Sequence, residues 1–246
     1  MNITNKEILK IALNQSSFDC NCNIQDFECN ENKIFISKEN QNAKKYFNLP
    51  FLCYFISYGN NIIASVSEEI KHYIIENIKE YKTCNFFDIA NIMPIITKYK
   101  VNTYYMIECF LPDIKNIQEL NCNYECKLLY REEFQNLYLP EWSNALSNKR
   151  PHLDKLAVGA YDNGELIGLA GCSADCDTMW QIGVDVLPKY RKQGIASSLT
   201  SKLAIECLKN GIVPFYSCIW SNVISKKNAL KSGFKPAWIE MSLLNN

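Results

Sequence analysis

The segment at residues 184–199, VDVLPKYRKQGIASSL, constrains the fold more than any other part of the chain. Its apolar start predicts a strand, Pro188 cannot continue that strand, and the residues after Gly194 suit a helix. The first N–H groups of a helix lack partners within the helix, and the helix dipole adds partial positive charge there. A strand that passes through a glycine turn into a helix therefore indicates an anion site that a pyrophosphate would fit.

The side chains around this turn agree with an anion site. Gly194 allows the backbone to approach phosphates closely, and Lys189, Arg191 and Lys192 add positive charge to a chain whose formal net charge is zero. The alternative is a solvated basic loop that an ordinary glycine cap closes. The segment is neither a Walker A loop nor a dinucleotide-binding fingerprint, because the glycine and lysine spacings of those motifs are absent.

Charge and hydropathy exclude some classes of partner. The chain carries 26 basic and 26 acidic side chains. Sequence-independent binding of nucleic acid needs a basic surface that neutralises phosphates, so we expect no nucleic-acid partner. No apolar run approaches the 18 residues that a membrane span needs, so we expect no membrane partner.

Twelve cysteines invite two other interpretations, a disulfide framework and a zinc site. The N-terminus lacks a charged-then-apolar signal region, and the chain is much longer than small secreted scaffolds. The chain has only two histidines, and its closely spaced cysteines do not have the C-x-x-C spacing of a zinc ribbon. We therefore expect a reduced cytoplasmic protein without a metal, in which cysteine acts as a small buried apolar residue.

The pattern of apolar residues predicts a mixed α/β (α+β) chain with a boundary near residue 124. Residues 1–123 are expected to form a smaller α/β domain of unknown role, with an opening helix, a hairpin over 51–67, helices from 68 and over 86–99, and a strand over 101–110. Residues 124–246 predict the order β-α-α-β-β-β-α-β-α-β, with short helices over 131–137 and 141–146 and a longer one over 194–209. The last helix is expected over 222–231 and the last strand over 238–244.

Two motifs in this second region resemble those of the GNAT superfamily of acyl-CoA N-acyltransferases. Arg191-x-x-Gly194-x-Ala196, preceded by Val186-x-Pro188, is similar to the superfamily's pyrophosphate signature. Asn222 and Ser225, followed by Ser232-Gly233-Phe234, resemble the helix and turn that close these domains. The resemblance covers residues 124–246 and implies a mixed, mostly antiparallel central sheet flanked by helices. The α/β region ahead of it resembles that of a two-domain subgroup.

The resemblance implies an N-acetyltransferase that moves an acetyl group from acetyl-CoA to a primary amine of a small molecule or peptide, by direct attack in a ternary complex. It also implies no metal and allows a homodimer. The strand before the turn would pair with pantetheine, the N–H groups at the turn would hold the pyrophosphate, and two residues of the last helix would meet the pantetheine arm. The implied cofactor-binding residues are Val184, Asp185, Val186, Arg191, Lys192, Gln193, Gly194, Ile195, Ala196, Ser197, Asn222 and Ser225. The local alternative is that Asn222 only caps the helix and Ser225 is only its first-turn hydroxyl.

The catalytic groups depart from the superfamily's commonest pattern. By alignment, the position that often carries a tyrosine acid is Ala229. Tyr216, Ser221 or Ser225 could take its place, or the thiolate could leave without assistance. Candidate bases are Asp185 and Glu141, although Asp185 could simply pair with a neighbouring Lys or Arg. The missing tyrosine leaves a second function open, a noncatalytic acyl-CoA-binding regulatory or sensor module.

Overall fold

The structure is a computed structural model that describes residues 3–78, 81 and 83–245. The chain divides into two compact units, and neither is a continuous segment. The first unit comprises Met1–Ile11 and Phe110–Pro236, and the second comprises Ala12–Cys109 and Ala237–Asn246. The predicted boundary at 123/124 therefore lies inside the first unit, and the chain passes between the units at 11/12, 109/110 and 236/237.

The first unit holds a five-stranded run of sheet in the order β9-β8-β7-β6-β5. Neighbouring strands are antiparallel except β8 and β9, which are parallel. This is the mixed, mostly antiparallel sheet that the resemblance implies. The elements are β5 (Glu125–Tyr130), α5 (Arg131–Phe134), β6 (Asp154–Asp162), β7 (Glu165–Ser173), β8 (Met179–Val186), α6 (Ile195–Lys209), β9 (Val213–Ile219) and α7 (Val223–Lys231), with 3-10 turns at Gln135–Leu137, Pro140–Trp142 and Pro188–Tyr190.

One predicted helix of this unit is wrong. Residues 141–146 do not form a helix, and only the 3-10 turn Pro140–Trp142 is present there. The N–H groups of Asn144 and Ala145 bond to the carboxylate of Asp185 instead of to carbonyls one helical turn back. A distant side chain therefore takes the donors that would have continued the helix.

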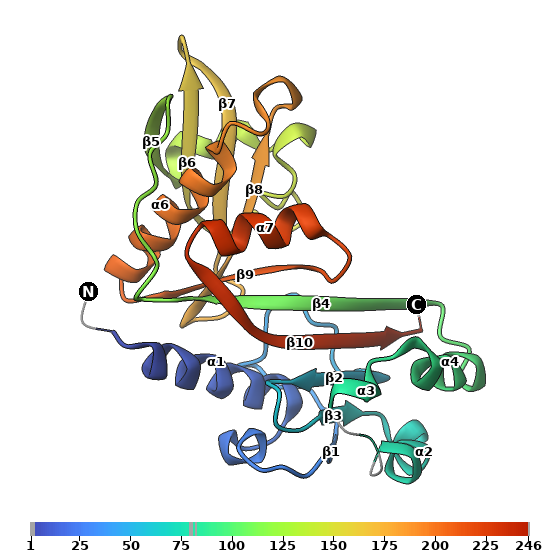
Figure 1. Cartoon of the computed structure of the whole chain (residues 1–246). Coiled ribbons are helices and arrows are strands. Elements are labelled where there is room, and N and C mark those ends of the chain that lie inside the picture. The colour runs from blue at the N-terminus through green and yellow to red at the C-terminus, as the bar shows by residue number, and fades with distance from the viewer. Residues whose placement is uncertain (1–2, 79–80, 82, 246) are drawn as a thin grey trace. The chain divides into compact units, whose positions relative to one another are not determined.

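The core of the first unit lies on both faces of the sheet. On one face α6 packs against β6, β7 and β8 (Figure 1). It does so through Ile195, Leu199, Leu203 and Cys207, which recur at helical spacing. On the other face a second cluster includes Phe134 and Trp142. Among the cysteines whose side chains are described, seven are buried, which confirms cysteine as core material.

The second unit is built around a hairpin and the C-terminal strand. The predicted hairpin forms from antiparallel β2 and β3, and the last strand pairs antiparallel with β2. The predicted helix over 86–99 forms over Ile89–Lys98, after a separate short helix at Thr83–Phe86, and the last strand begins at Phe234 instead of residue 238. The elements, some of which extend into the first unit, are α1 (Asn5–Cys20), a 3-10 turn (Ile24–Phe27), β1 (Lys33–Ile36), β2 (Cys53–Ser57), β3 (Ile63–Val66), α2 (Glu68–Ile78), α3 (Thr83–Phe86), α4 (Ile89–Lys98), β4 (Thr103–Pro112) and β10 (Phe234–Leu244).

A buried ion cluster lies inside the second unit. The Lys44 ammonium lies 2.8 Å from the Asp19 carboxylate and 3.6 Å from that of Glu240. Tyr54 and Trp238 also donate to Glu240. Desolvation alone would lower the pKa of Lys44, but the two carboxylates outweigh it and raise that pKa well above its usual value. The lysine therefore stays charged in the core.

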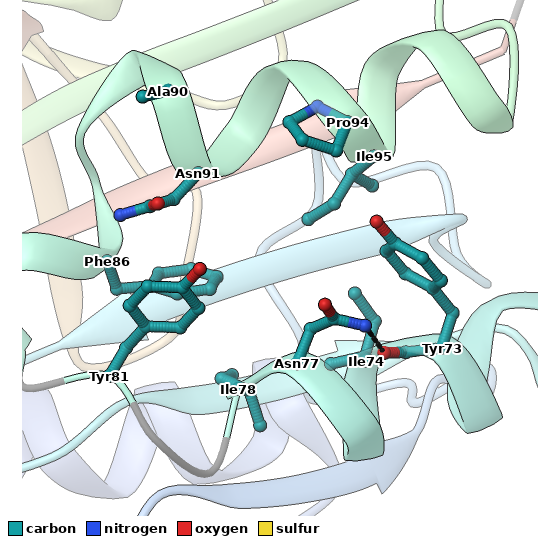
Figure 2. Close-up of a pocket in the computed structure, with 10 residues that line it drawn as sticks. All are labelled: Tyr73, Ile74, Asn77, Ile78, Tyr81, Phe86, Ala90, Asn91, Pro94 and Ile95. Atoms are coloured by element: carbon teal, nitrogen blue, oxygen red, sulfur yellow. Dashed lines mark hydrogen bonds between the residues drawn. The ribbon is translucent and has the colours of Figure 1, made fainter.

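The second unit also has a small cavity between α2 and α4, with a volume of about 50 Å³. Figure 2 shows Tyr73 and Asn77 of α2 facing Asn91 and Pro94 of α4 across it. This space admits a few water molecules but no coenzyme. Among the described residues, no helix is long and apolar enough to span a membrane.

Two glycines with positive φ offer a matched test of the packing in the first unit. Gly211 has φ 75° and open space around it, whereas at Gly233, with φ 89°, an added Cβ would lie 2.6 Å from the Cα of Ile117. We expect Gly211→Ala to cost about 1 kcal/mol for the left-handed backbone alone. Gly233→Ala should cost about 3 kcal/mol or more because the backbone of residues 116–117 must also move.

Urea denaturation of the two variants measures this difference. Equal free-energy losses in both would contradict the close packing of the 233 turn.

Candidate functional site

The site begins where β8 loses one neighbour. Its parallel ladder with β9 runs from Met179 to Ile182, whereas its antiparallel ladder with β7 continues to Val186. Within the described ladders, residues 183–186 therefore have no strand on the β9 side. Gln181 donates to the hydroxyl of Ser217 at 2.6 Å, a side-chain link between the strands at the end of their ladder. Beyond it, backbone N–H and C=O groups on one edge of β8 have no neighbouring strand and can pair with an extended ligand, although the Val186 carbonyl already accepts one bond from the Arg191 side chain.

The chain then passes through a tight turn into α6. Lys192 and Gly194 both have left-handed backbone, with φ 64° and 85°. Gly194 is the N-cap of the helix and its carbonyl accepts the first helical bond, from Ser198 at 3.0 Å. The N–H groups of residues 195–197 have no acceptor within the helix. This is the geometry of an anion site that the sequence predicts.

Three hydrogen bonds hold this turn in place. Arg191 Nε donates to the carbonyl of Val186 at 3.0 Å, and the Tyr190 hydroxyl donates to Asp162 at 2.8 Å. The Tyr124 hydroxyl donates to the Gln193 side chain at 2.9 Å. The turn is therefore preorganised. Arg191, Lys192 and Gln193 are exposed, while the side chain of Ile195 is buried in the core, so at that position only the backbone faces a ligand.

One cation at the turn could not be predicted from the sequence. A Cβ placed on Gly194 would lie 3.6 Å from Nζ of Lys231, so the ammonium group of the last residue of α7 stands beside the N-cap. Lys231 comes directly before the Ser232-Gly233-Phe234 motif. Only the packing of α7 against α6 brings it to the turn.

At the other end of α7, the structure brings two candidate acids together. The hydroxyls of Tyr216 on β9 and Ser225 on α7 lie 2.9 Å apart. Burial raises the pKa of Tyr216, so its phenol stays protonated at neutral pH. Ala229 is fully buried in the core of the unit.

Asn222 caps α7, as the local alternative predicts. Its Oδ1 accepts from the N–H of Ser225 at 3.1 Å. The residue is exposed, and its side-chain amide donates to no other described residue. Four apolar residues within three positions of it in the chain are also exposed, which could not be predicted from the sequence: Ile219, Trp220, Val223 and Ile224.

The two candidate bases differ in their surroundings. Both oxygens of Asp185 are occupied, by the Asn144 N–H at 2.8 Å, the Asn144 side-chain amide at 2.6 Å and the Ala145 N–H at 3.0 Å. The partners of this carboxylate are thus amides and not a Lys or Arg. Glu141 lies in the 3-10 turn Pro140–Trp142 and is exposed. The structure does not place a hydrogen bond between either candidate and the Tyr216–Ser225 pair.

Comparison with known proteins identifies the family. No curated protein is significantly similar to the chain. Solved chains that resemble it include a GNAT-family protein of Novosphingobium aromaticivorans (19% identity, covering 58% of this chain and 65% of that one, TM-score 0.44). A second is a GCN5-related N-acetyltransferase-like protein of Streptococcus suis (21% identity, covering 64% of this chain and 69% of that one, TM-score 0.48). A third is a GNAT-family acetyltransferase of Colwellia psychrerythraea (15% identity, covering 58% of each chain, TM-score 0.45).

The family model of the GNAT acetyltransferases matches residues 58–237. The match starts well before residue 124, so it includes part of the segment that the sequence analysis assigned to a separate domain. It covers the strand, the basic turn and α7, which carry the geometry described above, and more than half of the chain. The chain belongs to the GNAT acetyltransferase family.

Proposed function

We propose that the protein is an acetyl-CoA-dependent N-acetyltransferase whose acceptor is a primary amine of a small molecule or peptide. The observation that carries this proposal is the opening of β8 from β9 after Ile182, directly ahead of the preorganised turn. An extended chain of amides can pair with the free edge of β8 while an attached pyrophosphate reaches the start of α6.

The residues present fit the coenzyme. The N–H groups of residues 193–197 would hold the pyrophosphate, with the cations of Arg191, Lys192 and Lys231 around it. The backbone of residues 184–186 would pair with pantetheine, and the free amide of Asn222 would meet the same arm. Gly194 has φ 85°, a left-handed backbone conformation that favours glycine at this position.

Bound acetyl-CoA supplies an activated acetyl group: the amine nitrogen bonds to the thioester carbon as the carbon–sulfur bond breaks. The amine loses one proton and the departing sulfur gains one, so the chain needs a proton acceptor and a donor. Ser225 is half-buried at the start of α7, and Tyr216 lies behind it in the core. When the Tyr216 hydroxyl donates to Ser225, the Ser225 proton is free to point at the sulfur. Glu141 is exposed and remains the candidate base.

A calorimetric titration with acetyl-CoA tests the binding half of the proposal. Lys231→Ala should weaken binding about 10-fold, because it removes a cation beside the pyrophosphate. The matched control is Lys227→Ala, an exposed lysine of the same helix, which should change affinity less than about 2-fold. The Lys231 effect should shrink at high salt.

Absence of acetyl-CoA binding in the unmodified protein would overturn the proposal itself. Equal losses of acetyl-CoA affinity in Lys231→Ala and Lys227→Ala would overturn only the role of Lys231.

A double-mutant cycle tests the acid. Tyr216→Phe and Ser225→Ala should each lower kcat about 10-fold, and the double variant should be little slower than either alone, because the two hydroxyls act as one unit. The readout is free CoA thiol released at saturating acetyl-CoA. Multiplicative losses, or unchanged kcat, would show that this pair does not serve the leaving thiolate.

Ala229 is buried at the position that often carries the tyrosine acid, and this missing acid favours one rival function, a noncatalytic acyl-CoA-binding module. An amine panel separates the two functions. Binding of acetyl-CoA without release of thiol in the presence of any amine supports the sensor, and amine-dependent release supports the transferase.

A further inference from the structure

Asp185 holds a loop against the sheet. Its two oxygens accept three hydrogen bonds from Asn144 and Ala145, at 2.6 to 3.0 Å. All three partners donate, so a carboxylate accepts all three bonds. A carboxamide offers the two backbone N–H groups one neutral oxygen, and it keeps the side chain of Asn144 only if that amide turns over. We call residues 143–146 the clamped segment.

A pair of glycines lets this segment approach the sheet closely. Gly171 of β7 and Gly183 of β8 are direct cross-strand partners. A Cβ on Gly183 would overlap the carbonyl oxygen of Asn144, and one on Gly171 would overlap that of Ala145. Because Gly183 and Asp185 are two residues apart on one strand, they face the same side of the sheet. Two independent features of β8 thus fix the same short segment.

Both ends of the segment are also anchored. Trp142, Ala145 and Leu146 are buried in the cluster on this face of the sheet. The N–H of Ser147 donates to Asp154 at 3.0 Å, and that of Leu146 to the Trp142 carbonyl at 2.9 Å. The segment is therefore a rigid part of the first unit.

The position of the segment connects it with the site. Gly183, which lies under Asn144, is the first residue of β8 beyond its ladder with β9. The clamped segment therefore borders the opening on the face of the sheet opposite α6. Directly ahead of it is the turn that carries Glu141, and the side chains of Ser143 and Asn144 are exposed there.

We propose that Asp185 is a positioning residue for the acceptor amine and not the general base. It fixes the clamped segment as one wall of the acceptor site and sets the place of Glu141. This inference rests on the proposed acetyltransferase function. It predicts that loosening the clamp weakens use of the amine and leaves the coenzyme site, formed by the β8 edge and the start of α6, intact.

Hydrogen exchange of the protein without coenzyme tests the clamp directly. In Asp185→Asn the amides of Asn144 and Ala145 should lose about 10-fold or more of their protection, because each loses a charged acceptor. The matched control is Glu165→Gln, an exposed carboxylate of β7, which should leave both amides unchanged. Unchanged protection in Asp185→Asn would overturn the clamp, and this readout holds even if the protein proves not to bind acetyl-CoA.

Steady-state kinetics tests the role in the reaction. Asp185→Asn and Gly183→Ala, which keeps the carboxylate but displaces the segment, should both raise the KM for the amine about 10-fold or more. The Kd for acetyl-CoA should stay within about 2-fold, and the pH profile of kcat should keep its shape. Asp185→Glu retains the acceptor oxygens, so its KM for the amine should lie between those of the unmodified protein and Asp185→Asn. This variant replaces the other two in the test if they do not fold. Loss of kcat with an unchanged amine KM, together with loss of the acid limb of the pH profile, would identify Asp185 as the base and overturn the proposal.

Discussion

The site depends on one break in the sheet, the end of the β8–β9 ladder at Ile182. Up to that point β8 is an inner strand with a neighbour on each side. Beyond it, the pairing with β7 continues and keeps β8 extended. The edge of β8 that faced β9 therefore keeps strand geometry but has no neighbouring strand. Backbone hydrogen-bonding groups left in this way need a partner from water or from a ligand. An extended ligand with its own amides can fill the place of the missing strand.

The turn that follows places positive potential at the end of this edge. Its charge comes from unpaired helix N–H groups and nearby cations, in a chain with no net charge. Left-handed backbone at Lys192 and Gly194 directs these N–H groups, and side-chain bonds from Tyr124, Tyr190 and Arg191 keep the turn in place. Little reorganisation is then needed on binding, so more of the interaction energy appears as affinity. On the face of the sheet opposite α6, the bonds from Asp185 give the same rigidity to the clamped segment, the proposed wall of the acceptor site.

Features that depend on local signals could be predicted from the sequence. Glycine, proline and the periodicity of apolar residues predict the basic turn, a helix over 194–209 and the hairpin at β2–β3. The structure has all three, with Gly194 as the N-cap of the helix. Features that depend on distant partners could not. The donors of Asn144 and Ala145 go to Asp185, about 40 positions away, and this ends a helix that the local pattern favours. Lys231 reaches Gly194 only because two helices pack, and the C-terminal strand joins the hairpin of the second unit for reasons that no local pattern contains.

A crystal structure of the protein with acetyl-CoA tests the central claim most directly. The expected result is that pantetheine amides pair with the free edge of β8 at residues 184–186, the pyrophosphate binds the N–H groups of residues 193–197, and the thioester lies near Ser225. Pantetheine bound away from β8, with residues 183–186 paired to β9 instead, would contradict it.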